Sequence, residues 1–352
     1  MQLRARRVPS LLVPPGFRVL RQAAGGPAIL WKRTRYCQSV LWEGAALMRV
    51  GRDGAIRITS ISPLSSVLDQ VLNMAVALLL ARRGYRVLHG GALARNGLCL
   101  VVTGPPGAGK SSLVLAGARR GLEVISDEIV PLRRRGTVFE CPGGNPRIRI
   151  DPALLRQRRA EGAERKVGVD VRRLGYRHRA GPSRVAAFIF LGRRLGPAQP
   201  RFRLEALPPS QALVLLLQST YNRRVQTEPE RVAHFRDCAA AARLLPAWRL
   251  SVRAGLENVA AAARALDGLL DRLSAGHRAA VAQAPGGRRS GVYGAEPGSS
   301  ETPSISIHAW ASTGAAARST PITRRAGYPR LRRSPRAASD TSRQLPRNGD
   351  RS

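Results

Sequence analysis

A glycine-rich loop contains the residues best suited to chemistry. The segment GPPGAGKS, residues 104–111, has every fixed position of the GxxxxGK[ST] phosphate-binding loop. It follows an apolar run at 98–103 that is typical of a strand covered on both faces, and it precedes a segment, 110–120, with helical character. In such a loop the backbone N–H groups surround the β-phosphate, and the start of the helix adds partial positive charge. The segment therefore predicts a site for the phosphates of a nucleotide.

The individual loop residues have expected roles. Lys110 is expected to reach the β- and γ-phosphates as a catalytic residue, and the hydroxyl group of Ser111 is expected to bind Mg²⁺. Lys110 is one of only three lysines among the 59 basic residues of the chain, and the other basic residues are arginines. A lysine in such a composition indicates a position that needs a compact ammonium group and not a broad guanidinium group. The residues predicted to contact the nucleotide are Gly104, Pro105, Pro106, Gly107, Ala108, Gly109, Lys110, Ser111 and Ser112.

Two adjacent acids, Asp127 and Glu128, follow the loop unusually early. A helix of about 11 residues rises roughly 16 Å, and a strand of about five residues returns a similar distance, so Asp127 should lie level with the phosphates. There it could accept the proton of an attacking hydroxyl group, which makes it the candidate general base. The alternative is that Asp127 is only a metal ligand or a cap of a helix or turn. Successive strand residues point to opposite faces, so Glu128 is expected to bind the metal unless the chain turns at once.

Three further residues are candidates for the same site. His89, in VLHGGALARNG, precedes the loop by one hairpin and could orient Asp127 or sense its charge, although a lone histidine beside two glycines is also common as a structural residue. Arg147 and Arg149, in NPRIRID, share one face of a predicted strand. They could clamp a phosphate or an acidic peptide, or they could simply face solvent.

The pattern of the chain predicts an α/β protein in three parts. Residues 1–66 contain short strand-like pieces broken by Pro and Gly, and are read as a small β-rich leader packed on the core. Residues 67–273 are read as the catalytic domain. Residues 274–352, rich in Ser, Pro, Gly, Thr and Arg, are expected to form a disordered tail. Helices are predicted at 65–83, 110–120, 209–219, 229–243 and 256–273, and strands at 98–103, 122–126, 129–132, 137–140, 146–150, 186–191, 201–206 and 248–252.

The composition limits the classes of partner. The formal charge of +37 suggests a polyanion, but nearly all of it is arginine spread along the chain, as a coding bias would produce, so nucleic acid is not the expected partner. The four cysteines show no metal-binding spacing and are read as reduced thiols. There is no convincing export signal, and the longest apolar run, 71–81, is too short to span a bilayer. We therefore expect a cytoplasmic protein with no membrane contact.

Several stretches in order resemble the HPr kinase/phosphorylase superfamily, and within it the HPr-kinase-related proteins found beside peptide-modifying gene clusters. The resemblance covers about residues 65–273. It rests mainly on LHGGAL, GPPGAGKSS and RRGLEVISDEIVPL, with support from CPGGNPRIRIDPALL, RVAAFIFLGRR and PPSQALVLLLQSTYN. It implies a PEPCK-like P-loop kinase fold with a mixed sheet. It also implies that ATP and Mg²⁺ are used to phosphorylate a serine of a small protein or peptide.

The resemblance also implies roles for single residues. Lys110 and Ser111 take the loop roles, Asp127 matches the general base, Glu128 matches the second acid, and His89 matches the histidine ahead of the loop. Lys166 resembles a lysine that leads a strand in the related kinases, which implies a phosphate contact. The second acid is Glu where the family has Asp, Ser112 stands where true HPr kinases often have glutamate, and no HPr-binding signature follows the acids.

Two other functions fit the sequence. One is a kinase or ATPase acting on a small metabolite, because relatives of the implied fold bind small acids and the sequence shows no peptide groove. The other is a basic nucleotide-binding module that grips nucleic acid and uses the nucleotide as a switch. The sequence is compatible with a homo-oligomer, and it does not identify the acceptor.

Overall fold

The computed structural model describes residues 2–11, 15–21, 28–61, 63–151 and 167–283. The chain divides into two units, 1–307 and 308–352, and every described residue belongs to the first. Lys166 and the predicted tail beyond residue 283 lie outside the described residues. Within the described part, no helix combines the length and apolar character needed to cross a membrane.

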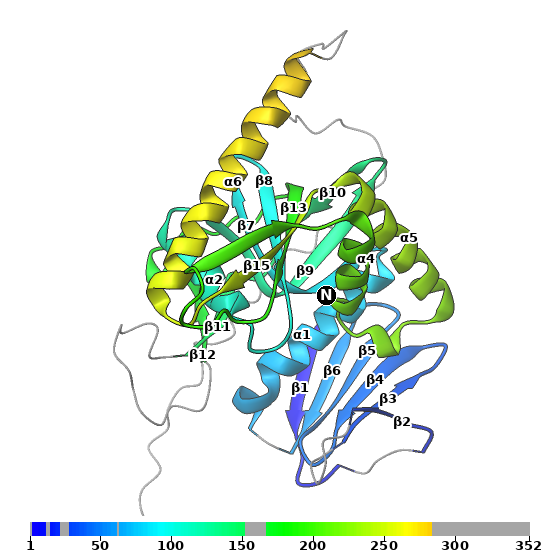
Figure 1. Ribbon diagram of the computed structural model, residues 1–352. Coiled ribbons are helices and arrows are strands. Elements are labelled where there is room, and N and C mark those ends of the chain that lie inside the picture. The colour runs from blue at the N-terminus through cyan, green and yellow to red at the C-terminus, as the bar shows by residue number, and fades with distance from the viewer. Residues whose placement is uncertain (1, 12–14, 22–27, 62, 152–166, 284–352) are drawn as a thin grey trace, which may run out of the picture. The chain divides into compact units, whose positions relative to one another are not determined.

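The N-terminal region forms a six-stranded sheet, drawn in blue in Figure 1. Its strand order is β1-β6-β5-β4-β3-β2, and only the β1–β6 pair is parallel. The strands are β1 (Leu3–Arg7), β2 (Arg18–Arg21), β3 (Ile29–Arg33), β4 (Cys37–Trp42), β5 (Ala46–Gly51) and β6 (Ile56–Ser60). Helix α1 (Leu64–Arg82) follows, and its last residue donates a hydrogen bond of 2.6 Å to the carbonyl oxygen of Gly51. The strand-like pieces predicted from the sequence therefore form one sheet that is tied to α1.

A seven-stranded mixed sheet forms the centre of the molecule. Its order is β10-β9-β7-β8-β13-β15-β14. The strands are β7 (Arg86–Arg95), β8 (Leu98–Thr103), β9 (Glu123–Arg135), β10 (Val138–Cys141), β13 (Ser183–Leu191), β14 (Phe202–Ala206) and β15 (Ala247–Val252). Strands β8, β13 and β15 are parallel, whereas β7 is antiparallel to both of its neighbours, β8 and β9. Consequently β9 runs in the direction of β8, with β7 between them.

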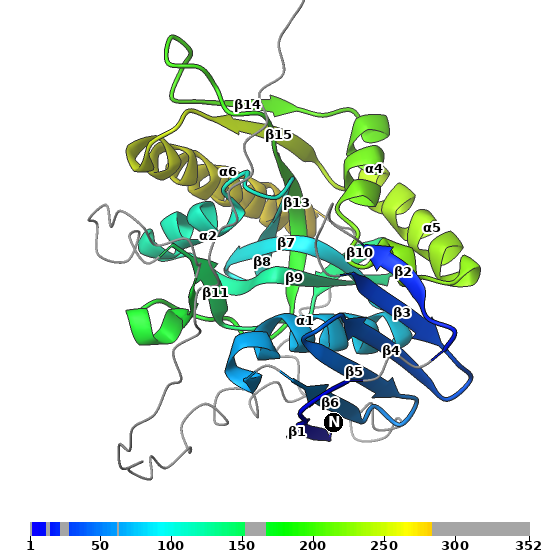
Figure 2. The ribbon, with the colours of Figure 1, turned by 90° about the horizontal axis from the view of Figure 1, so that it is seen from below.

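Helices cover both faces of this sheet (Figures 1 and 2). The helices are α2 (Lys110–Arg119), α4 (Pro209–Gln218), α5 (Glu228–Leu244) and α6 (Leu256–Gln283). Alternate residues of β8 face opposite layers: Leu100 and Val102 pack with α2 and α6, whereas Val101 packs with α4 and α5. This explains the uninterrupted apolar run of β8, because both of its faces are buried. A two-stranded sheet, β11 (Arg147–Ile150) and β12 (Val167–Asp170), lies beside α2.

The predicted elements are confirmed with two differences. The strands expected at 122–126 and 129–132 are one strand, β9, because both segments pair with the long strand β7. The helix expected to end at residue 273 continues to Gln283, so residues 274–283, expected to be part of the disordered tail, are helical. The added segment is rich in alanine, which has the highest helix propensity and costs little to extend a formed helix.

Candidate nucleotide-phosphate site

The phosphate loop connects β8 to α2 as the sequence predicted. The loop leaves β8 after Thr103, and α2 begins at Lys110. Gly109, which caps the start of α2, has a φ of +97°, in the left-handed region where a residue with a side chain is strained. The Lys110 side chain is 8% exposed and extends back across the loop. Its Nζ donates hydrogen bonds to the carbonyl oxygens of Gly104, at 2.9 Å, and Pro105, at 3.1 Å. The ammonium group therefore lies at the loop.

Strand register brings the two acids level with the end of β8. Gly91 of β7 is paired with Val102 of β8 on one side and with Asp127 of β9 on the other. Glu128 lies one residue further along, at the level of Thr103. The acids are therefore two strand spacings, or about 10 Å, across the sheet from the end of β8. Asp127 therefore lies level with the last residues of β8, and its level relative to the phosphates stays a prediction; the intervening strand is the one that carries His89.

Asp127 lies directly beside the loop helix. It accepts a hydrogen bond from the hydroxyl group of Ser111, and its Oδ2 accepts another from the backbone N–H of Arg149, at 3.1 Å. The residue is only 5% exposed, and this burial raises the pKa of its carboxyl group. Hydrogen bonds from Arg149 and Ser111 and the charge of Lys110 act in the opposite direction. A carboxylate with a raised pKa takes up a proton more readily, as a general base must.

The side chain of Glu128 accepts hydrogen bonds from Arg149 and Asn73. Its φ of +76° is unusual for a residue with a side chain, and it marks a local turn of the backbone within β9. The guanidinium group of Arg149 donates to Oε1 of Glu128 at 3.1 Å, and the amide of Asn73 donates to Oε2. Arg149 thus contacts both acids, Asp127 through its backbone and Glu128 through its side chain. Neighbouring residues of a regular strand point to opposite faces, and this turn explains how Asp127 and Glu128 can both contact Arg149.

His89 supports the backbone at this turn. Its Nδ1 lies 3.1 Å from the carbonyl oxygen of Glu128. Since a carbonyl oxygen only accepts, the imidazole proton is on Nδ1. Burial lowers the pKa of His89, and the nearby charge of Lys110 lowers it further. The imidazole of His89 therefore donates to the backbone of Glu128 as a neutral ring and positions this part of the strand.

Two neighbours of the acids were not predicted. Asn73 comes from α1, and Tyr221 follows α4 with its ring centroid 5.9 Å from that of His89. Burial raises the pKa of Tyr221, and the charge of Glu128 raises it further. Asn73 is the one polar residue of the apolar run VLNMAV, and a polar residue in such a run can indicate a functional position. The sequence held no comparable signal for Tyr221.

The two predicted arginines have different contacts. Arg147 and Arg149 alternate with the buried residues Ile148 and Ile150, so they share a strand face as expected. Only Arg149 has a described contact with the acids, whereas the Arg147 guanidinium donates to the carbonyl oxygen of Gly168 at 3.1 Å.

The oxygen atoms beside the loop fit Mg²⁺. This ion is usually bound through one or two protein oxygens together with phosphate oxygens and water. The hydroxyl group of Ser111 and the carboxylate of Asp127, which are hydrogen-bonded to each other, offer such a pair. The carboxylate of Glu128 is hydrogen-bonded to Asn73 and Arg149, and its predicted role as a metal ligand stays a prediction.

Comparisons with known proteins support the loop assignment. No protein-family profile matches the chain. The chain is 32% identical over 143 residues to the tRNA modification GTPase MnmE of Bradyrhizobium sp. (strain ORS 278), and the match covers 39% of this chain and 30% of that protein. It thus spans less than a third of this relative. The solved structure of the Hpr(Ser) kinase/phosphatase from Coxiella burnetii aligns with 17% identity and a TM-score of 0.28, over 56% of this chain and 99% of that one. From the loop, its geometry and the GTPase relative, the chain is a P-loop nucleotide-binding protein with a mixed α/β fold.

Proposed function

We propose that this protein is an ATP- and Mg²⁺-dependent kinase that transfers the γ-phosphoryl group to a serine of a small protein or peptide. The observation that carries the proposal is the position of Asp127. Its buried carboxylate is hydrogen-bonded to the loop residue Ser111 and lies level with the end of the loop strand. An acid at this point is close to both the terminal phosphate and the hydroxyl group that attacks it.

Each loop residue then has a task in the transfer. The loop N–H groups and Lys110 hold the phosphates, and Ser111 would hold Mg²⁺, which would neutralise charge on the phosphate oxygens. Asp127 accepts the proton of the attacking serine. Arg149 lies over both acids and is partly exposed, so its guanidinium group can bind the transferred phosphoryl group or an acidic residue of the acceptor.

The test is transfer of label from γ-labelled ATP to peptides encoded near this chain, with Mg²⁺ present. We expect transfer by the wild type and by Asp53→Asn, because Asp53 only caps a turn in the N-terminal sheet and Asn can do the same. We expect Asp127→Asn to bind nucleotide but not to transfer label. Transfer at the wild-type rate by Asp127→Asn would refute the base assignment.

The hydrogen bond between Asp127 and Ser111 would also be expected if Asp127 were a metal ligand and not the general base. Titration of Mg²⁺ separates the two roles. Loss of the base alone leaves the Mg²⁺ dependence of nucleotide binding unchanged, whereas loss of a metal ligand moves that dependence to higher Mg²⁺ concentrations.

A second candidate function, a nucleotide-switched nucleic-acid-binding module, is favoured by the N-terminal sheet. Arg4, Arg57 and Arg49 are cross-strand neighbours on β1, β6 and β5, and all three are exposed. None of the ion pairs found in the described part of the chain includes them. Like charges directly opposite one another destabilise a sheet, and a polyanion would offset this cost. The relative named as a tRNA modification GTPase is consistent with such a ligand.

Salt dependence tests this second candidate. If the arginine row contacts phosphates, RNA binding should weaken steeply with salt. Replacing Arg49 and Arg57 by Gln should reduce the slope by about 0.7 to 0.9 for each residue. Equal slopes for the variant and the wild type would exclude this face as the binding surface.

A further inference from the structure

A groove between α2 and α6 begins directly beyond the phosphate loop. It encloses a cavity of about 120 Å³. It is lined by Ser112, Leu115, Ala116, Arg119, Arg120, Leu256, Val259, Ala260 and Arg264. Ser112 follows the loop serine, so one end of the groove adjoins the place where the phosphates are expected. The site described above does not use this groove.

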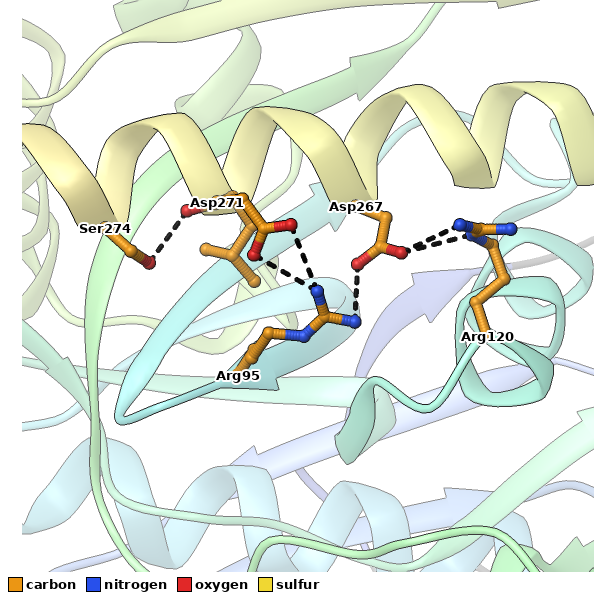
Figure 3. Close-up of polar contacts among 6 residues, drawn as sticks. Arg95, Arg120, Asp267, Asp271 and Ser274 are labelled. Carbon is orange, nitrogen blue, oxygen red and sulfur yellow. Dashed lines mark hydrogen bonds and ion pairs between the residues drawn. The ribbon is translucent and has the colours of Figure 1, made fainter.

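The topology explains why the groove opens at the loop. Helix α2 follows β8 and helix α6 follows β15, and these strands are parallel members of one sheet. Both helices therefore start at the same edge of the sheet. At the other end, Arg120 after α2 pairs with Asp267 of α6 at 3.0 Å, and Asp267 also pairs with Arg95 at 2.7 Å (Figure 3). The two helices thus run side by side away from the loop.

The chemistry of the groove suits a nucleoside. Five of the nine lining residues are apolar, and two of these, Leu115 and Val259, pack into the core below. Leu256 is 47% exposed at the end nearest the loop, so its side chain is accessible to a ligand there. From Ser112 to Arg119 the groove extends about 10 Å along α2, which matches the reach of a ribose and a base. Ligand sites commonly combine such apolar walls with a few polar groups.

We propose that this groove binds the ribose and base of the nucleotide whose phosphates lie on the loop. The inference rests on the proposed nucleotide site and adds the part of it that recognises the nucleoside. The polar side chains among the lining residues are guanidinium and hydroxyl groups, with no carboxylate. Guanidinium groups only donate hydrogen bonds, and both adenine and guanine offer ring acceptors to such donors, so ATP and GTP should both be accepted.

The test fills the groove and compares nucleotides with a ligand that has no nucleoside. Ala260→Phe places a ring in the groove from an exposed position of α6, and Ala116→Phe does so from α2. Ala275→Phe, also exposed on α6 but about 20 Å further along the helix, is the matched control. Binding of ATP, GTP and inorganic tripolyphosphate is measured by calorimetry on the full chain with Mg²⁺, after thermal melts show which variants are folded.

We expect each groove variant to weaken ATP and GTP by about tenfold or more and to change tripolyphosphate binding by less than about twofold. The control should bind all three ligands like the wild type. Unchanged nucleotide affinity in a folded groove variant would overturn the inference, and so would equal losses for nucleotides and tripolyphosphate, although the loop site would then stand. If the wild type binds neither ATP nor tripolyphosphate, the proposed function fails and this inference fails with it.

Discussion

Gly91 lies between the loop helix and the acids, and its replacement by alanine tests how tightly this arrangement is fixed. A Cβ atom at Gly91 would lie 2.5 Å from Cγ2 of Val114 on α2 and 3.5 Å from Oδ1 of Asp127. The first distance is about 1 Å shorter than an ordinary contact between carbon atoms. Val114 is completely buried, so it has no open space to move into. Something must therefore shift, and we expect α2 to move away from the sheet and to take Lys110 and Ser111 with it.

Two effects follow from that displacement in Gly91→Ala. Forcing one methyl group into a packed core costs about 1 to 3 kcal/mol of unfolding free energy, measured by urea denaturation. Moving catalytic groups by about 1 Å lowers phosphoryl transfer by roughly 100-fold. Gly181→Ala is the control, because Gly181 is exposed with no atom within 4 Å of a new Cβ. It should change stability by less than about 0.5 kcal/mol and leave transfer intact. A Gly91→Ala variant with wild-type stability and wild-type transfer would refute the packing argument.

Three further predictions follow from single contacts. Lys110→Ala should abolish nucleotide binding, measured by calorimetry, while the far-ultraviolet circular dichroism stays that of the wild type. Asp267→Ala should lower the unfolding free energy by about 2 kcal/mol, because it leaves Arg95 and Arg120, both partly buried, without this partner. Burial raises the pKa of Asp127 above its ordinary value of 3.8, so ionisation costs the wild type stability as pH rises through the raised pKa. Asp127→Asn should therefore melt at a higher temperature than the wild type at neutral pH, and this advantage should vanish below about pH 3.8; an advantage that grows on acidification would contradict the argument.

Local sequence determined the phosphate loop and the position of the acids. The loop, α2 and the first half of β9 are consecutive, and the rise per residue of a helix and a strand fixes where such a unit returns. Asp127 could therefore be placed beside the loop without knowing the rest of the fold. The apolar run of β8 likewise predicted a strand buried on both faces, which the two helical layers confirm.

Tertiary structure decided which residues surround those acids. Asn73 is 55 residues from Glu128 in sequence. Tyr221 follows α4, which packs on the face of the central sheet opposite to α2. Hydrophobic periodicity and residue spacing describe contacts within a short, continuous segment of the chain. They contain no information about residues that only the packing of distant elements brings together. The insertion of β7 between β8 and β9, and the groove between α2 and α6, have the same origin, because both depend on strand order and helix packing.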